Sequence, residues 1–213
     1  MSKVIGIMGE SGSGKTTSLE KLNPKETYYI DCDKKGLSWK GWRKQYNETN
    51  KNYYCTDYAD KVEKVMQGVS DTRPEIKYLV VDTLNGIMVA DEMRRIKEKT
   101  YDKWVDLATA IYNIVDKAYT YRDDLTFIFI FHSQTERTDD GYNFTRIKTS
   151  GKKLDKISVE TKLTTLLLCK AVDGNYIFET KANKSTVKTP KGAFDTDTIP
   201  NDITLVIDAL KDY

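Results

Sequence analysis

The chain has 213 residues, 39% of them hydrophobic, and its 34 Lys and Arg against 32 Asp and Glu leave a formal net charge of +2. Because positive and negative charges nearly balance, the protein as a whole is neither strongly basic nor strongly acidic. Any surface that binds nucleic acid must therefore be a local basic patch. The apolar runs are too short to cross a bilayer, and three widely spaced cysteines argue against a disulfide framework or a zinc site. The start of the chain has no signal-peptide pattern. We therefore expect one domain over residues 1–213, cytoplasmic and without a membrane partner.

Short apolar runs alternate with helical patterns through the first 130 residues. Buried strands are predicted at Val4–Met8, Thr27–Ile30, Tyr78–Asp82 and Phe127–Phe131. Helices are predicted after the first strand to about Leu22, over Tyr58–Val69, and from Ile87 to about Tyr121 with a break near Thr100. This alternation predicts an α/β fold with a mainly parallel central sheet flanked by helices.

The last third of the chain has a different pattern. A polar stretch, Thr135–Lys153, carries a hairpin signal at Asp139-Asp140-Gly141. Two strands follow at Leu163–Cys169 and Asn175–Thr180, and a closing helix is predicted over Asp202–Leu210. The late strands are expected to extend the sheet with antiparallel partners.

The first strand runs into a complete phosphate-loop motif, G-x-x-x-x-G-K-[ST]. The residues expected to contact a nucleotide are Gly9, Glu10, Ser11, Gly12, Ser13, Gly14, Lys15, Thr16 and Thr17. The glycines allow successive N–H groups to point at phosphate oxygens, and the following helix adds the positive end of its dipole. Lys15 would reach the β- and γ-phosphates. The alternative is a glycine-rich turn that matches by accident, but the strand before it and the predicted helix after it favour ATP or ADP binding.

A second acidic position completes the expected site for a cation. Asp82 follows four apolar residues of the third strand. An Asp in this position is the usual partner of a phosphate loop. Its carboxylate and the Thr16 hydroxyl would hold Mg²⁺ against the phosphates.

Strand ends also supply groups that could act on an attacking water. Asp31 and Asp33 follow the second strand, and Gln134 follows the fourth with His132 beside it. Since ligands bind at the carboxyl ends of parallel strands, Lys15, Asp33, Asp82 and Gln134 are predicted to face one crevice. Asp33 would orient the water and Gln134 would sense the γ-phosphate. The alternatives are turn chemistry for Asp33, an ordinary loop amide for Gln134, and a packed strand-end residue for His132.

Several stretches resemble those of a known family. Ile30-Asp31-Cys32-Asp33 is similar to the RecA-type strand that ends in a catalytic acid, and Phe129–Gln134 to the strand that ends in a sensor Gln. Thr180–Lys184, Val187–Pro190 and Ile199–Ile203 resemble phage-encoded RecA-core ATPases, often described as phage nucleotide-binding or AAA-domain proteins. The resemblance covers nearly the whole chain. It implies a RecA-like P-loop NTPase fold and a role in recombination by single-strand annealing or strand exchange.

Two positions depart from this resemblance. Asp33 stands where relatives usually carry Glu and is one methylene shorter, so slow turnover is expected. Lys181 stands where relatives often carry Arg, and would act as a point charge. The first four strands offer no further cation obviously aimed at the crevice. The resemblance therefore implies a homo-oligomer, a ring or a filament, in which Lys181 and Lys184 of one subunit complete the site of the next.

Two segments combine cations with aromatic rings, as single-strand binding surfaces do. Lys34–Tyr54 is either such a surface or an amphipathic element whose aromatics are core. Thr135–Lys153 is either the DNA-contacting loop or a plain solvated hairpin. Single-stranded DNA is the expected partner, with phage or host replication and recombination proteins as further candidates.

Three functions remain open on the sequence. The first is an ATPase that acts with single-stranded DNA. The second is a P-loop kinase for a small molecule or nucleotide, because Asp31-x-Asp33 resembles the substrate-binding acids of some kinases. The third is a nucleotide-switched assembly protein with little turnover.

Overall fold

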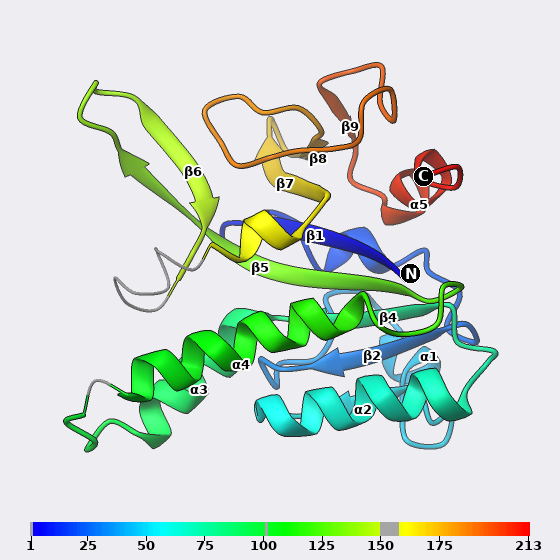
Figure 1. Ribbon diagram of the computed structural model, residues 1–213. Helices are drawn as coiled ribbons and strands as arrows, with labels where there is room; N and C mark the ends of the chain where they lie inside the picture. Colours follow the sequence, from blue (N-terminus) through cyan, green and yellow to red (C-terminus); the bar gives the residue numbers. More distant parts are fainter. Residues whose placement is uncertain (1, 101, 150–157) are drawn as a thin grey trace.

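The computed structural model describes residues 2–100, 102–149 and 158–213. Its centre is a nine-stranded sheet with the order β3-β2-β4-β5-β1-β7-β8-β9, and β6 pairs with β5 (Figure 1). The strands are β1 (Lys3–Gly9), β2 (Thr27–Asp31), β3 (Tyr53–Cys55), β4 (Tyr78–Asp82), β5 (Thr126–Arg137), β6 (Asn143–Ile147), β7 (Thr165–Val172), β8 (Asn175–Glu179) and β9 (Thr198–Pro200). The α-helices are α1 (Trp42–Gln45), α2 (Ala59–Thr72), α3 (Leu84–Arg94), α4 (Asp102–Ala118) and α5 (Ile203–Ala209), and 3₁₀ turns lie at η1 (Thr17–Leu19) and η2 (Val159–Lys162).

Parallel pairing brings the predicted site residues to one edge of the sheet. β1 lies between β5 and β7 and is parallel to both, and β2 and β4 continue the parallel part. In this register Gly9 is level with His132, and Asp31 with Asp82. β8 and β9 then add antiparallel strands. The predicted fold class is confirmed: a mainly parallel α/β sheet with antiparallel strands late in the chain.

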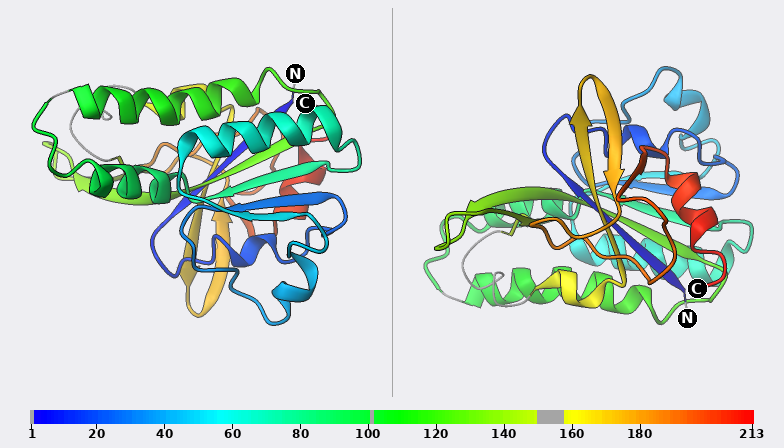
Figure 2. Two further views of the ribbon diagram at one scale, coloured as in Figure 1. Left: turned by 90° about the horizontal axis from the view of Figure 1, so that it is seen from below. Right: turned by 90° about the horizontal axis from the view of Figure 1, so that it is seen from above.

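The two faces of the sheet form separate apolar cores because side chains alternate along each strand. Phe127, Phe129 and Phe131 pack with α2, α3 and α4 on one face. Ile128 and Ile130 pack with η1, the α1 region and α5 on the other. Figures 1 and 2 show the resulting three layers, with α2–α4 on one side of the sheet and α5 on the opposite side. Among the described helices, none combines the length and apolar character needed to span a membrane.

The prediction of an α-helix after the phosphate loop was wrong. Instead of a helix to Leu22, the chain forms only the single 3₁₀ turn η1. The local residues explain this, because Ser18 Oγ donates to the carbonyl oxygen of Lys15 at 2.6 Å, and short hydroxyl side chains compete with helical bonding. Pro24 then leaves little length for a helix. The expected contribution of a helix dipole at the loop is therefore not supported.

The fourth strand is longer than predicted. It was expected to end at Phe131, but β5 continues to Arg137 because its second half pairs with β6 in an antiparallel hairpin. This hairpin projects beyond the rest of the sheet (Figure 1). The break near Thr100 between α3 and α4 is confirmed, as is the closing helix, whose N-cap Asp202 accepts the N–H of Thr204 at 3.0 Å.

The Lys34–Tyr54 segment contributes its aromatic rings to the core. Trp39 and Tyr46 are buried, and Trp42 and Tyr53 pack against the same cluster. The amphipathic alternative therefore holds for Trp39 and Tyr46, whose buried rings cannot stack on bases, whereas Tyr54 is exposed. The short strand β3 at its end was not predicted.

Candidate functional site

The loop after β1 has the backbone conformation predicted for a phosphate loop. Gly12 and Gly14 have φ angles of 79° and 95°, a region that glycine enters without strain. Gly14 has a second constraint, because a Cβ there would lie 2.7 Å from a ring carbon of Tyr176. Ser13 Oγ is buried and, within the described chain, has no hydrogen-bond partner. The loop thus holds a buried hydroxyl that could bond a polar ligand.

The last strands support this loop from outside, which the sequence did not reveal. The Cys169 thiol donates to the Ser13 carbonyl oxygen at 2.9 Å, and Asn201 Nδ2 donates to that of Gly14 at 3.0 Å. Burial raises the pKa of Cys169 to about 12, so the thiol remains a donor at neutral pH. These bonds hold carbonyl oxygens of the loop on its outer side, which favours N–H groups facing the phosphate side.

Lys15 is held inside the loop by carbonyl oxygens. Its Nζ donates to Gly9 at 2.9 Å and to Glu10 at 2.7 Å, and the side chain is buried. Burial lowers the pKa of Lys15, while the nearby Asp82 charge acts in the opposite direction. An ammonium bonded only to neutral carbonyls has much to gain from a phosphate oxygen.

Asp82 is a deeply buried acid of the site. Its Oδ2 accepts the Thr16 hydroxyl at 2.8 Å and the Tyr29 hydroxyl, whereas Oδ1 has no hydrogen-bond partner among the described residues. Burial raises the pKa of Asp82, and the bond from Tyr29 acts against that rise. A buried, half-satisfied carboxylate is costly, so it favours binding of a cation or of a water held by one.

These residues fit Mg²⁺ as the phosphate-loop motif implies. The unpaired Oδ1 of Asp82 and the Thr16 hydroxyl are hard oxygen ligands beside the loop. Within residues 2–100, 102–149 and 158–213, no group of three or more His, Cys, Asp and Glu could hold a metal by itself. Mg²⁺ would therefore take its other ligands from phosphates and water, as it commonly does.

The two acids after β2 have different environments. Asp31 accepts the N–H groups of Lys34 and Gly36, each at 2.8 Å, so it closes a turn. Asp33 Oδ1 accepts the Thr83 hydroxyl at 2.8 Å and lies against Gly86, where a Cβ would come within 2.4 Å of it. Asp33 is therefore the acid placed beside the crevice.

His132, rather than Gln134, lies next to Asp33. The two residues line one pocket of about 370 Å³ at the ends of β2 and β5. The His132 N–H donates to Asn85 Oδ1 at 2.8 Å, and burial followed by the Lys15 charge lowers the pKa of its imidazole. Gln134 lies in the β5–β6 hairpin, and its Nε2 donates to Glu136 at 2.8 Å. The interpretation of His132 as a mere packed residue is not supported, and the sensor role of Gln134 stays a prediction.

A lysine in the first part of the chain does reach this crevice, contrary to expectation. Lys35 Nζ lies 2.5 Å from Asp33 Oδ2. Its position two residues after Asp33 was the available sequence signal for this pair. That spacing alone does not predict the contact, because it does not fix the direction of a side chain in a turn. The expectation that the region of the first four strands offers no further cation aimed at the crevice was wrong.

Lys181 and Lys184 are exposed on the late part of the chain. Lys181 Nζ lies 3.0 Å from Asp197, and Lys184 Nζ stands 4.7 Å from the centre of the Tyr142 ring. Lys184 thus contacts the tip of the β5–β6 hairpin. Both ammonium groups are accessible to another molecule.

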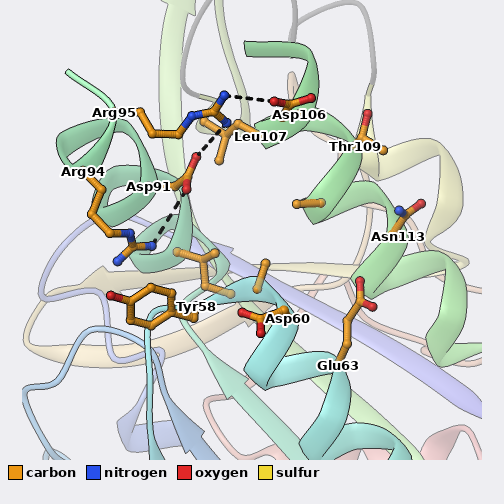
Figure 3. Close-up of a pocket in the computed structure, with 13 residues that line it drawn as sticks. Tyr58, Asp60, Glu63, Asp91, Arg94, Arg95, Asp106, Leu107, Thr109 and Asn113 are labelled. Carbon is orange, nitrogen blue, oxygen red and sulfur yellow. Dashed lines mark hydrogen bonds and ion pairs between the residues drawn. The ribbon is translucent and has the colours of Figure 1, made fainter. Parts of the chain in front are cut away.

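A separate pocket of about 470 Å³ lies between α2, α3 and α4. Figure 3 shows that its charged side chains pair with one another, as Arg94 and Arg95 do with Asp91, and Arg95 with Asp106. None of the predicted site residues lines it. This pocket is not part of the crevice at the strand ends.

The raised pKa of Asp82 predicts a pH-dependent cost to folding. Above a pH of about 4 the unfolded carboxyl ionises freely, whereas in the folded chain ionisation is opposed by burial, so stability falls as pH rises. Asp82→Asn removes this cost. The unfolding midpoint of the variant minus that of the native chain should increase from about pH 4 to about pH 8, measured in EDTA with Asp212→Asn as control. A difference that shrinks with pH would contradict the assignment.

The comparison with known proteins agrees with this geometry. The profile of the AAA domain family matches residues 1–193, a range that contains every predicted site residue. No curated protein matches the chain. The match covers most of the chain, and the sheet, the phosphate loop and Asp82 are those of a P-loop NTPase. The chain therefore belongs to the AAA domain family and has an AAA-type P-loop ATPase-like domain.

Proposed function

We propose that this protein binds ATP with Mg²⁺ and hydrolyses it. The observation that carries the proposal is the convergence of Lys15, the Thr16–Asp82 pair, Asp33 and His132 at the carboxyl ends of adjacent parallel strands. Family membership supports nucleotide binding and ATPase activity in general. The specific reaction of this chain is our proposal.

Each group at the crevice has a task in that reaction. Lys15 would exchange its two carbonyl partners for oxygens of the β- and γ-phosphates. Thr16 and Asp82 would hold Mg²⁺, which neutralises charge on the phosphates and draws electron density toward the leaving group. Tyr29 keeps Asp82 Oδ2 oriented, since burial raises the pKa of its hydroxyl well above the usual value and leaves it a donor.

Asp33 and His132 are the best placed groups for the attacking water. Asp33 Oδ1 is held by Thr83, so Oδ2, which here pairs with Lys35, is the oxygen that would accept a hydrogen bond from water. His132 is level with Gly9 at the loop, and its backbone is held by Asn85. We assign contact with the γ-phosphate to His132 rather than to Gln134, because Gln134 lies two residues further out, in the hairpin.

Lys15→Ala should abolish tight nucleotide binding. Loss of a charge-assisted phosphate contact is expected to weaken affinity for ATP and ADP by at least about tenfold. Isothermal titration calorimetry with Mg²⁺ would measure this, with Lys64→Ala on the exposed face of α2 as control. Native affinity in Lys15→Ala would overturn the nucleotide site.

The products formed from ATP by the native protein distinguish hydrolysis from the kinase and assembly-protein alternatives. An ATPase releases ADP and inorganic phosphate in equal amounts. A kinase releases ADP and keeps the phosphoryl group on an acceptor, for which the pocket beside Asp33 leaves room. A nucleotide-switched assembly protein binds ATP and releases neither.

We further propose that single-stranded DNA binds at the β5–β6 hairpin. The hairpin extends away from the sheet and carries Arg137, Lys148 and the Tyr142 ring at its surface. Lys184 adds a cation beside that ring. Lys152 and Lys153, also expected there, lie outside the described residues. The resemblance to phage RecA-core ATPases supports a role in phage recombination or replication.

Tyr142→Ala should weaken binding of a single-stranded oligonucleotide in the presence of ATP. Stacking on one ring contributes about 1–3 kcal/mol, and affinity should also fall steeply with salt. Fluorescence anisotropy would measure both. Tyr213→Ala is a matched control, because Tyr142 and Tyr213 are each 55% exposed and lie at opposite ends of the molecule. Equal loss in both variants, or salt-insensitive binding, would argue against the hairpin.

The third part of the proposal is an oligomer with nucleotide between subunits. Lys181 and Lys184 are exposed and could reach a second copy of the chain. Val89 and Met93 are also exposed, at 55% and 61%, on α3, and Val89 lines the pocket that holds Asp33. Apolar side chains at the rim of a polar site favour cover by a neighbouring subunit.

Lys181→Ala should bind ATP normally and hydrolyse it poorly. Mixing it with Lys15→Ala should restore part of the activity, since some interfaces would pair an intact loop with an intact Lys181. Steady-state phosphate release from the mixture, compared with each variant alone, tests this. A native chain that remains monomeric with ATP and DNA and turns over fully would rule the arrangement out.

A further inference from the structure

The turn after β2 gives two adjacent lysines different acidic partners. Lys34 and Gly36 have φ angles of 58° and 76°, and both of their N–H groups are bound by the Asp31 carboxylate. The Tyr53 hydroxyl donates to the same carboxylate at 2.7 Å. Asp31 therefore fixes the path of the turn, and with it the direction in which each lysine leaves the backbone.

Lys34 lines the pocket that holds Asp33 and His132, but it pairs with a different acid. Its Nζ lies 2.8 Å from Asp57, which is also 3.2 Å from Arg94. Arg94 in turn lies beside Asp91 at the pocket between α2, α3 and α4 (Figure 3). This ion-pair group holds Lys34 on the α3 side of the turn.

Lys35 points into the crevice. Its ammonium lies 2.5 Å from Asp33 Oδ2, and half of its side chain is exposed. Burial lowers the pKa of Lys15 and of His132, and the charge of Lys35 acts in the same direction on both. Burial raises the pKa of Asp82, and the Lys35 charge opposes that rise. Lys35 is therefore electrostatically close to all three groups that surround the expected phosphates.

We propose that Lys35 is a cation that the γ-phosphate of bound ATP takes over from Asp33. This inference rests on the proposed ATPase function. Without a triphosphate, Lys35 pairs with Asp33 Oδ2 and competes with a water for that oxygen. When ATP binds, the γ-phosphate offers a stronger anionic partner, and Asp33 keeps Thr83 at Oδ1 while Oδ2 becomes available. ADP lacks the γ-phosphate and leaves the ion pair closed.

The transfer of Lys35 from Asp33 to the γ-phosphate would couple charge neutralisation on that phosphate to the release of Asp33 for the attacking water. The water oxygen bonds to the γ-phosphorus, the bond from that phosphorus to the β–γ bridging oxygen breaks, and the water proton is accepted at Asp33 before it leaves with the products. Lys35 keeps its proton throughout and neutralises charge on the γ-phosphoryl oxygens. A lysine suits this task because its ammonium is a compact charge on a flexible stem.

Lys35→Met tests the inference, with Lys34→Met as the matched control. In calorimetric titrations with Mg²⁺, Lys35→Met should lose affinity for a non-hydrolysable ATP analogue by at least about tenfold and keep its affinity for ADP within about twofold. Lys34→Met should change neither. Asp33→Asn should act in the opposite direction, with a larger preference for the analogue over ADP, because Lys35 no longer has to leave a carboxylate.

Retained ADP affinity also demonstrates that Lys35→Met is folded. An equal loss for ADP and the analogue, or an unchanged preference for the analogue, would overturn the role of Lys35. If Lys15→Ala loses both nucleotides while Lys35→Met behaves as native, this inference fails and the proposed ATP site stands. If Lys35→Met and Lys15→Ala both bind the two nucleotides as the native chain does, this inference and the proposed function both fail.

Discussion

The candidate site depends on one buried carboxylate. Asp82 accepts hydroxyl donors from Thr16 and Tyr29 at one oxygen and, within the described chain, leaves the other unpaired. Such a group is costly to bury, and the fold tolerates it because neighbouring cations reduce the cost. Bound Mg²⁺ would remove it. The position that destabilises the empty protein is thus the one that favours the nucleotide complex.

The phosphate loop is shaped from both ends of the chain. Its own glycines permit the backbone turns, but Cys169 and Asn201 hold its outer carbonyl oxygens, and Tyr176 packs against Gly14. The late antiparallel strands therefore do more than extend the sheet. Since they contact the loop directly, they connect it to the part of the chain that carries Lys181, which in the proposed oligomer faces the neighbouring subunit.

Charge in the crevice is balanced within a single subunit. Lys15 and Lys35 face Asp33 and Asp82, and the turn held by Asp31 decides that Lys35 rather than Lys34 takes part. A cation from another subunit would then add to an existing pair instead of supplying the only positive charge beyond Lys15. Regulation by assembly and regulation by the γ-phosphate are compatible in this arrangement.

The sequence alone determined the phosphate loop, the buried parallel strands and the carboxylate of Asp82, because each depends on a local pattern of residue types. The position of Gln134 could not be predicted in this way, since β5 continues past Phe131 only when β6 is there to pair with it. The pocket that His132 shares with Asp33 could not be predicted for the same reason, since it depends on the register of β5 against β1. The spacing of Lys35 from Asp33 did not fix its direction, because that depends on how Asp31 and Tyr53 hold the turn. The support of the loop by Asn201 has no local signal, because Asn201 and Gly14 are 187 residues apart. Tertiary structure alone decided them.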